Sequence, residues 1–285
     1  MSNADFPLVA VVTGAGSGIG KATAIELGRR GCRVLLHTRR NIQGLMKTAS
    51  ECRGGRTVVA DLKNDTSLYS FVNAAFAWFG YVDLWVHAAG ADVLTGSAKD
   101  WSFDRKLSEL WEMDIRAMML LSRMVAQRQV QQEVVQGRLP SMVHIGWDQA
   151  FQGMEGDSGQ YFCAIKAAVS AFSKSLAKSY APHLRVNCIE PGWIQTEWGQ
   201  QTSNAWSERA TGESLLDRWG KPEDVARLIA AISLGDGEFL NGQSLKLNGG
   251  WRGGEPVIKC ATTEDGISPI HHSRHGPMQT RLSND

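Results

Sequence analysis

The chain has 285 residues, 43% of them hydrophobic, and its 30 basic residues nearly balance its 29 acidic residues. This size suits one large α/β domain, and the balanced charge gives no reason to expect nucleic acid or a membrane surface as a partner. No apolar run approaches the roughly 20 residues of a membrane span, no secretory signal is expected, and the five scattered cysteines are typical of reduced thiols in a cytoplasmic protein.

Short apolar segments alternate with longer segments of helical periodicity along most of the chain. In chain order we expect strand 8–12, helix 18–30, strand 33–37, helix 42–52, strand 56–60, helix 67–79, strand 84–87, one long or two consecutive helices over 103–134, strand 141–145, helix 160–180, strand 184–189, helix 222–233 and strand 244–247. This repeating order predicts an α/β fold, a single-domain Rossmann-type doubly wound parallel sheet with helices on both faces.

Two segments interrupt the alternation and suggest how the chain is divided. Residues 193–217, rich in Trp, Gln and Ser, lie between a strand and a helix, where an insertion commonly forms a substrate lid. Residues 252–285 are polar, and we expect a C-terminal extension outside a domain of residues 1–251, ordered against another subunit. His271, His272 and His275 lie in this extension, but no cysteine or carboxylate completes a ligand set, so no metal is expected.

The segment Thr13-Gly14-Ala15-Gly16-Ser17-Gly18-Ile19-Gly20 follows the first predicted strand and opens the first predicted helix. A glycine turn in this position lets the backbone approach a pyrophosphate and points the positive helix N-terminus at the negative charge. We therefore expect a dinucleotide to contact Gly14, Ser17, Gly18, Ile19 and Gly20. A tight structural turn is the alternative.

Arg39 and Arg40 follow the second predicted strand, and no acidic residue occurs over residues 33–50. A carboxylate here would bind the ribose hydroxyls of NAD, whereas arginine favours the extra phosphate of NADP. We expect NADP rather than NAD, with solvated surface arginines as the alternative. Asp61 and Leu62, at the end of the third predicted strand, are suited to receive the adenine amino group.

Further short motifs follow in order: Ala88-Ala89-Gly90, Arg185-Val186-Asn187, Pro191-Gly192-Trp193-Ile194-Gln195-Thr196, Gly220 to Ala226, and Asn241-Gly242-Gln243 through Gly250. From Leu8 to about Gly250 the chain resembles the short-chain dehydrogenase/reductase family. The resemblance implies a small-molecule substrate and a homodimer or homotetramer built on the helices over 103–134 and 160–180. It also implies the remaining cofactor contacts, with Ile194 and Thr196 holding the nicotinamide carboxamide, Lys166 the nicotinamide ribose, and Ala89, Gly90, Pro191 and Gly192 beside them.

The catalytic positions depart from the family pattern. The family uses tyrosine as the acid, serine to bind the substrate oxygen, asparagine to hold a relay water, and lysine. The corresponding residues here are Phe162, Trp147, Asp114 and Lys166, so only the lysine matches. The sequence thus favours the cofactor site more strongly than the reaction.

Two neighbouring residues are candidates for a displaced acid. Tyr161 precedes Phe162 and points about 100° away on a helix, so only a bulge or a late helix start would return it to the site; otherwise it packs near the lid or a subunit contact. Asp148 follows Trp147 and would be partly desolvated facing the nicotinamide, with a raised pKa; otherwise it faces solvent or caps a helix. Asp114 is expected to pair with Lys166, with a surface position as the alternative.

Four tryptophans fall on segments expected to border the substrate mouth. Trp147, Trp193, Trp198 and Trp206 suit an aromatic or ring-shaped ligand, with packing of lid against core as the alternative. Fold alone leaves three functions open. The favoured function is an NADP-dependent oxidoreductase acting on a small carbonyl or alcohol through a displaced acid. The others are a redox-neutral lyase or epimerase with Asp148 as base, and a non-catalytic NADP-binding sensor.

Overall fold

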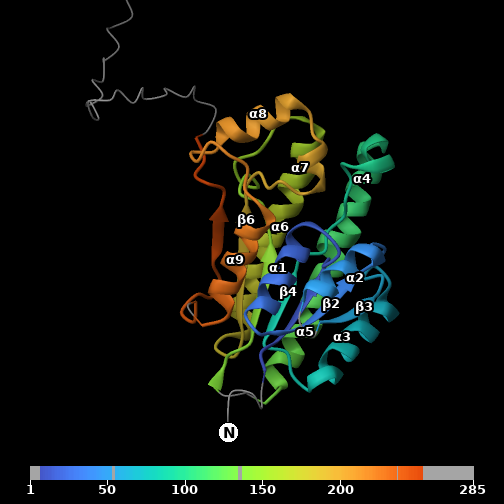
Figure 1. Ribbon diagram of the computed structural model, residues 1–285, viewed down its shortest axis with the longest axis vertical. Helices are drawn as coiled ribbons and strands as arrows, with labels where there is room; N and C mark the ends of the chain where they lie inside the picture. The colour runs from blue at the N-terminus through green and yellow to red at the C-terminus, as the bar shows by residue number, and fades with distance from the viewer. Residues whose placement is uncertain (1–6, 53–54, 134–136, 236, 253–285) are drawn as a thin grey trace, which may run out of the picture. The chain divides into compact units, whose positions relative to one another are not determined.

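The computed structural model describes residues 7–52, 55–133, 137–235 and 237–252. Its centre is one sheet of seven parallel strands in the order β3-β2-β1-β4-β5-β6-β7 (Figure 1). The strands are β1 (Val9–Thr13), β2 (Arg33–Thr38), β3 (Arg56–Val59), β4 (Leu84–His87), β5 (Ser141–Ile145), β6 (Arg185–Pro191) and β7 (Ser244–Leu247). The predicted α/β fold class is confirmed.

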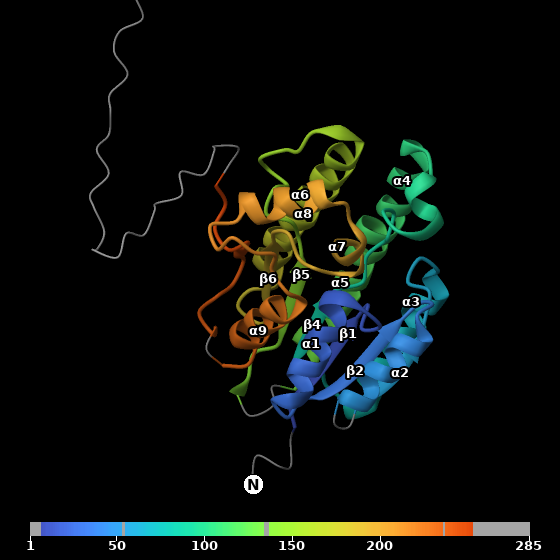
Figure 2. The ribbon, with the colours of Figure 1, turned by 45° about the horizontal axis from the view of Figure 1, so that its top comes forward.

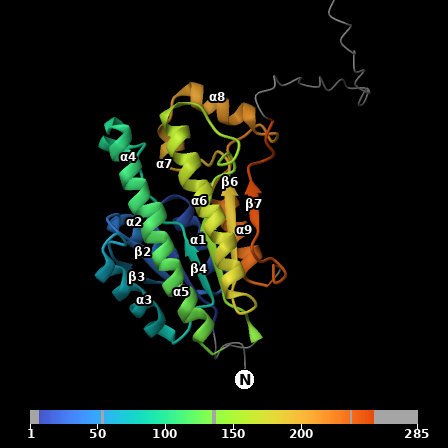
Figure 3. The ribbon, with the colours of Figure 1, turned by 180° about the vertical axis from the view of Figure 1, so that it is seen from behind.

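Helices cover both faces of the sheet. The helices α1, α2 and α9 pack on one face, and α3, α5 and α6 pack on the other (Figures 1 and 3). The helices are α1 (Gly18–Arg29), α2 (Ile42–Glu51), α3 (Asp65–Phe79), α4 (Phe103–Leu110), α5 (Met118–Gln131), α6 (Gly156–Tyr180), α7 (Glu197–Gln201), α8 (Asn204–Glu213) and α9 (Pro222–Ser233), with a short 3₁₀ turn η1 (Gly96–Asp100) and a π-helical segment η2 (Trp111–Ala117).

The core is split by the sheet into two apolar layers, which explains the continuous apolar strands. All five residues of β1 are buried because helices cover both of its faces. Phe71, Trp85 and Leu121 pack on the side of α3 and α5, and Leu27 and Ile229 pack on the side of α1 and α9. The strand order reverses between β1 and β4, which places the ligand-binding crevice of this fold at the carboxyl ends of those two strands.

Most predicted elements occur, and the differences fall at the carboxyl end of the sheet. The helical stretch predicted over 103–134 is one continuous run of α4, η2 and α5, with π-helical geometry over Trp111–Ala117. Helix α6 begins at Gly156 rather than at Gln160. The insertion 193–217 contains two helices, α7 and α8, which lie beyond the carboxyl ends of the strands (Figure 2).

All of these elements lie within one unit, Met1–Gly253. The predicted extension 252–285, with its three histidines, falls outside the described residues apart from Arg252, so the division of the chain stays a prediction. Within the described ranges, no helix is both long and apolar enough to cross a membrane.

Candidate cofactor cleft and ligand pocket

The glycine turn packs against the loop that follows β4. Gly14 has a φ of +69°, and a Cβ on it would lie 2.8 Å from the Ala88 carbonyl oxygen, so only glycine allows this approach. The backbone amides of Ala88 and Ala89 both donate to the Thr13 hydroxyl, each over 3.1 Å. The two loops therefore form one backbone surface at the point where the strand order reverses.

A cleft of about 520 Å³ opens along this surface. It brings together most of the predicted cofactor residues: Gly14, Ser17, Gly18, Ile19, Gly20, Arg39, Arg40, Leu62, Ala89, Gly90, Lys166 and Thr196. Asp61 is not among the residues that line it; this carboxylate is exposed and accepts from the Lys63 backbone amide over 3.1 Å. A glycine cradle at a helix N-terminus fits the pyrophosphate of a dinucleotide.

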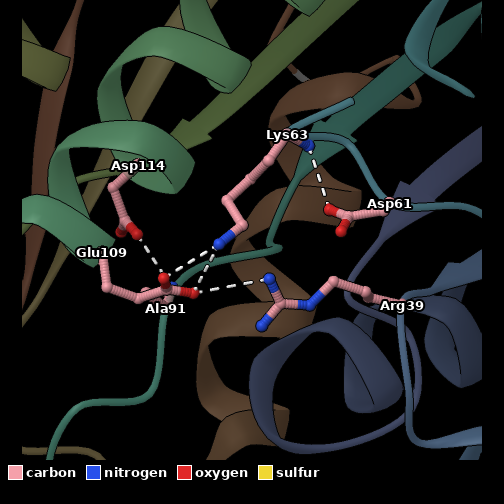
Figure 4. Close-up of polar contacts among 6 residues, drawn as sticks. All are labelled: Arg39, Asp61, Lys63, Ala91, Glu109 and Asp114. Atoms are coloured by element: carbon pink, nitrogen blue, oxygen red, sulfur yellow. Dashed lines mark hydrogen bonds and ion pairs between the residues drawn. The ribbon is translucent and has the colours of Figure 1, made fainter. Parts of the chain in front are cut away.

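Lys166 and Asp114 meet at the inner end of the cleft. The Lys166 ammonium donates to Asp114 Oδ1 over 3.0 Å and to the Ile145 carbonyl oxygen over 3.3 Å. Asp114 is buried, and its second oxygen accepts from the Ala91 amide over 2.8 Å (Figure 4). The predicted pair is present, and Asp114 is not a surface charge. It lies on the π-helical segment η2, a geometry often found at functional sites.

A second, mostly apolar pocket of about 320 Å³ adjoins the cleft. Both cavities share Ile19, Phe162, Lys166, Thr196 and Trp198 in their walls. The pocket is also lined by the remaining predicted cofactor residues and by several large apolar side chains: Pro191, Gly192, Ile194, Leu94, Met154, Trp147, Trp193 and Trp206. The shared wall places the end of the cleft directly beside an apolar ligand site.

The tryptophans of the insertion pack together as well as line this pocket. The rings of Trp193, Trp198 and Trp206 have pairwise centroid distances of 5.6 to 6.1 Å, and Trp219 joins them from the following loop. The Trp193 indole donates to Glu213 on α8 over 2.7 Å. The same rings therefore pack the insertion together and line the pocket, and an aromatic or ring-shaped ligand stays a prediction.

Tyr161 lies outside both cavities. The late start of α6 that would return it to the site does not occur, because the helix begins earlier than predicted. Its ring is buried against Phe103 and Phe162, and its hydroxyl shares a hydrogen bond of 3.0 Å with Ser158. Of these residues, Ser158 and Phe162 reach the pocket wall, but Tyr161 does not.

Asp148 is buried behind the pocket wall: it does not face solvent and is not among the residues that line the cleft or the pocket. One carboxylate oxygen accepts from Asn248 over 2.8 Å and would lie 3.2 Å from a Cβ on Gly192, and the other oxygen has no hydrogen-bond partner. Burial raises the pKa of this carboxyl to about 6. The predicted rise in pKa is present, but the side chain does not face the cleft.

The acidic side chains on the segment from Asp148 to Asp157 do not form a metal-ligating group, since Glu155 pairs with Arg209 on α8. Among the residues that the structure describes, no three potential metal-ligating side chains cluster.

Two charged residues near the cleft were missed by the sequence analysis. Glu109 of α4 accepts from Lys63, which follows β3, and from Arg39, which follows β2 (Figure 4). No local pattern marks these residues, because the three segments lie far apart in the sequence. Only the position of α4 above the ends of β2 and β3 brings them together.

A glycine turn at the switch point of a doubly wound sheet, with an apolar pocket beside it, defines a dinucleotide-binding α/β protein with a second ligand site. Residues 14–252 match the model of a family described as enoyl-(acyl carrier protein) reductase. The chain belongs to this family, which is part of the short-chain dehydrogenases/reductases.

Individual relatives are similar over nearly the same span. The chain is 30% identical over 247 residues to 3beta-hydroxysteroid dehydrogenase 1 of Eggerthella lenta, covering 84% of this chain and 92% of the relative. It is 26% identical over 254 residues to 2-dehydro-3-deoxy-D-gluconate 5-dehydrogenase of Escherichia coli, covering 85% and 94%. A 3-ketoacyl-(acyl-carrier-protein) reductase from Brucella melitensis, solved with NADH, superposes with a TM-score of 0.75 at 22% identity over 85% and 97% of the two chains, a similarity of fold.

Proposed function

We propose that this protein is an NADP-dependent oxidoreductase of the short-chain type that acts on a flat, apolar carbonyl or alcohol. The observation that carries the proposal is the junction of the two cavities. Among the residues that the structure describes, Lys166 is the one titratable side chain in the walls of both the cleft and the pocket. A proton can therefore reach a bound substrate from Lys166 beside the cofactor.

The residues that line the cleft support the binding of NADP. The glycine turn would hold the pyrophosphate, and Arg39 and Arg40 would bind the extra phosphate of NADP. When bound, the nicotinamide supplies the hydride chemistry. No acidic residue occurs over residues 33–50, the segment that carries these arginines, which supports NADP over NAD.

We propose that Lys166, besides contacting the nicotinamide ribose, supplies the proton of the reaction. An ammonium carries three N–H groups, and Asp114 and the Ile145 carbonyl accept two of them. The third is left for the oxygen of a ligand at the junction. We propose that Lys166 donates this proton to the substrate oxygen in the reducing direction, in place of Tyr161 or Asp148, which both lie outside the cavity walls.

The pocket supports a ring-shaped substrate. Indole rings and Phe162 present large flat apolar surfaces, and the polar side chains in the wall are few. The relative at 30% identity is named as a hydroxysteroid dehydrogenase, which agrees with a fused-ring ligand. A small carbonyl compound would leave much of this pocket unfilled.

The test measures NADPH binding first and NADPH oxidation second, with a panel of apolar cyclic ketones. Lys166→Ala should lower kcat by about 100-fold or more with a turned-over ketone, as expected for loss of a general acid. Lys166→Arg keeps the charge and should keep most of the cofactor affinity. An alanine variant with unchanged kcat would remove Lys166 from the proton step.

A second candidate function is a non-catalytic NADP-binding protein. It is favoured by one observation: Trp147 and Phe162 meet edge to face, with ring centroids 6.5 Å apart, where family members carry hydroxyl side chains. This candidate predicts NADPH binding without turnover in the natural protein, and new ketone reduction in Phe162→Tyr. The lyase or epimerase reading has no comparable support, because its proposed base, Asp148, lies behind the pocket wall.

A further inference from the structure

Glu109 is a carboxylate held between two cations at the edge of the cofactor cleft. Its oxygens lie 2.8 and 3.0 Å from the Lys63 ammonium and 3.4 Å from the Arg39 guanidinium (Figure 4). All three side chains are about one quarter exposed. The cluster joins α4 to the loops after β2 and β3, so it spans three segments around one end of the cleft.

The members of this cluster differ in their access to the cleft. Arg39 lines it, whereas Glu109 and Lys63 are not among the lining residues. Burial acts to raise the Glu109 pKa, but the hydrogen bonds and charges of Lys63 and Arg39 outweigh it and leave the pKa below its usual range. Glu109 is therefore a negative charge next to an arginine that faces the cofactor.

We propose that Glu109 sets the preference between NADP and NAD by competing with the extra phosphate of NADP for Arg39. This inference rests on the proposed binding of NADP beside Arg39 and Arg40. A guanidinium that bonds to Glu109 cannot turn fully toward a phosphate, and the carboxylate itself repels that phosphate. NAD lacks the phosphate and is unaffected by this competition.

Lys63 has the opposite effect in the same cluster. It donates two short hydrogen bonds to Glu109, whereas the Arg39 contact is longer. Lys63 thereby offsets the negative charge of Glu109 and weakens the attraction between Glu109 and Arg39. Without Lys63, Glu109 would draw Arg39 more strongly and NADP would bind less well. Glu109 and Lys63 are specificity residues that act through Arg39, without contact to the reacting atoms.

The experiment measures the dissociation constants of NADPH and NADH by fluorescence titration, so it needs no substrate. Glu109→Gln keeps the shape of the side chain and should tighten NADPH binding about three- to tenfold, with little change for NADH. Lys63→Met should weaken NADPH binding by a similar factor. In an Arg39→Ala background, Glu109→Gln should lose its effect, because the two residues act as one unit.

Glu26→Gln is the matched control. It removes the same charge from an ion pair, with Arg30, that lies in the last turns of α1 away from the glycine turn, and it should leave both constants unchanged. A melting curve for each variant checks that it is folded. If Glu109→Gln leaves the ratio of the two constants unchanged, or shifts it toward NADH, the inference is overturned while the proposed function stands. Failure of the natural protein to bind either cofactor overturns both.

Discussion

Asp148 is the residue whose environment differs most from that of an ordinary carboxyl. Its pKa is raised by burial to about 6 in the folded chain, against 3.8 for a free side chain. Between about pH 4 and pH 6 the folded chain therefore holds a proton that the unfolded chain has lost, and the stability of the protein falls as pH rises through this window. Above about pH 6 the carboxyl is ionised in both the folded and the unfolded chain, so it no longer makes the stability depend on pH.

Asp148→Asn should escape this cost, because an amide carries no charge and still offers an oxygen to Asn248. The difference in free energy of unfolding, variant minus natural protein, should be larger at about pH 7.5 than at about pH 4, by about 1 to 3 kcal/mol. Urea unfolding at both pH values measures it. Asp157→Asn, which removes an exposed carboxyl at the start of α6, is the control, and an equal gain there would contradict the prediction.

Single residues were predictable from the sequence where a motif fixes their place. The glycine turn and the pair of Lys166 with Asp114 are examples, since each lies at a set distance from a strand or on a helix facing the cleft. The direction of Asp148 was not predictable, because its partner Asn248 lies 100 residues away in the sequence, and the direction of Tyr161 depends on where α6 begins. Glu109 could not be found at all, because its partners come from two other segments.

At the scale of elements, Glu213 is one of the side chains that hold α8 over the ligand pocket. Glu213 accepts from Trp193 over 2.7 Å, from Gln149 over 3.2 Å and from Arg209 over 2.7 Å, so it joins the helix to the loops after β5 and β6. The tryptophan rings supply the apolar part of the same contact. Loss of Glu213 would leave the side-chain donors of Gln149, which is buried, and of Trp193, which is half-buried, without this partner.

Glu213→Ala should therefore release α8 while the sheet stays folded. Amide hydrogen exchange over residues 204–213 should accelerate about tenfold or more, in keeping with a local opening made easier by 1 to 2 kcal/mol. Exchange in β1 and β4 should not change. Glu213→Gln keeps an acceptor oxygen and should show a smaller effect, and equal protection in all three proteins would argue against this role of the carboxylate.

The sheet was more predictable than the loops above it. Strands buried on both faces are nearly continuous apolar runs, so their limits can be read within one or two residues. The start of α6 was placed four residues late, because Gly156-Asp157-Ser158-Gly159 has poor helix propensity. A local contact accompanies this early start: a Cβ on Gly159 would lie 2.0 Å from the Met154 carbonyl oxygen, so only glycine lets the preceding loop pack this closely against the first turn of the helix.

At the scale of the whole molecule, one outer face of the described unit is formed by the continuous helical run of α4, η2 and α5 and by α6, which lies beside it (Figure 3). These are the helices through which the family resemblance predicts subunit contacts. Large apolar side chains are exposed there, including Trp111 at 55% and Leu120 at 40%. We expect a homodimer or homotetramer that buries these residues, and a change of Leu120 should weaken it.

Light scattering after size exclusion measures the assembly directly. The natural protein should have two or four times the mass of one chain, and Leu120→Glu should shift it toward the monomer at low micromolar concentration, because a charge would be buried in the contact. Met46→Glu, on the opposite face of the sheet, should have no such effect. A monomeric natural protein would disprove the predicted oligomer.

The close packing of Gly14 against Ala88 and Ala89 also bears on how a nucleotide enters. The loop after β4 and the hydroxyl of Thr13 give the turn its shape through contacts within the chain itself. The conformational entropy of this turn is lost when the chain folds. Binding of a nucleotide therefore does not have to order the turn, and we expect little movement of the backbone on binding. The shape of the glycine turn does not depend on the residues at the catalytic positions. Substitutions at those positions can therefore leave nucleotide binding unchanged.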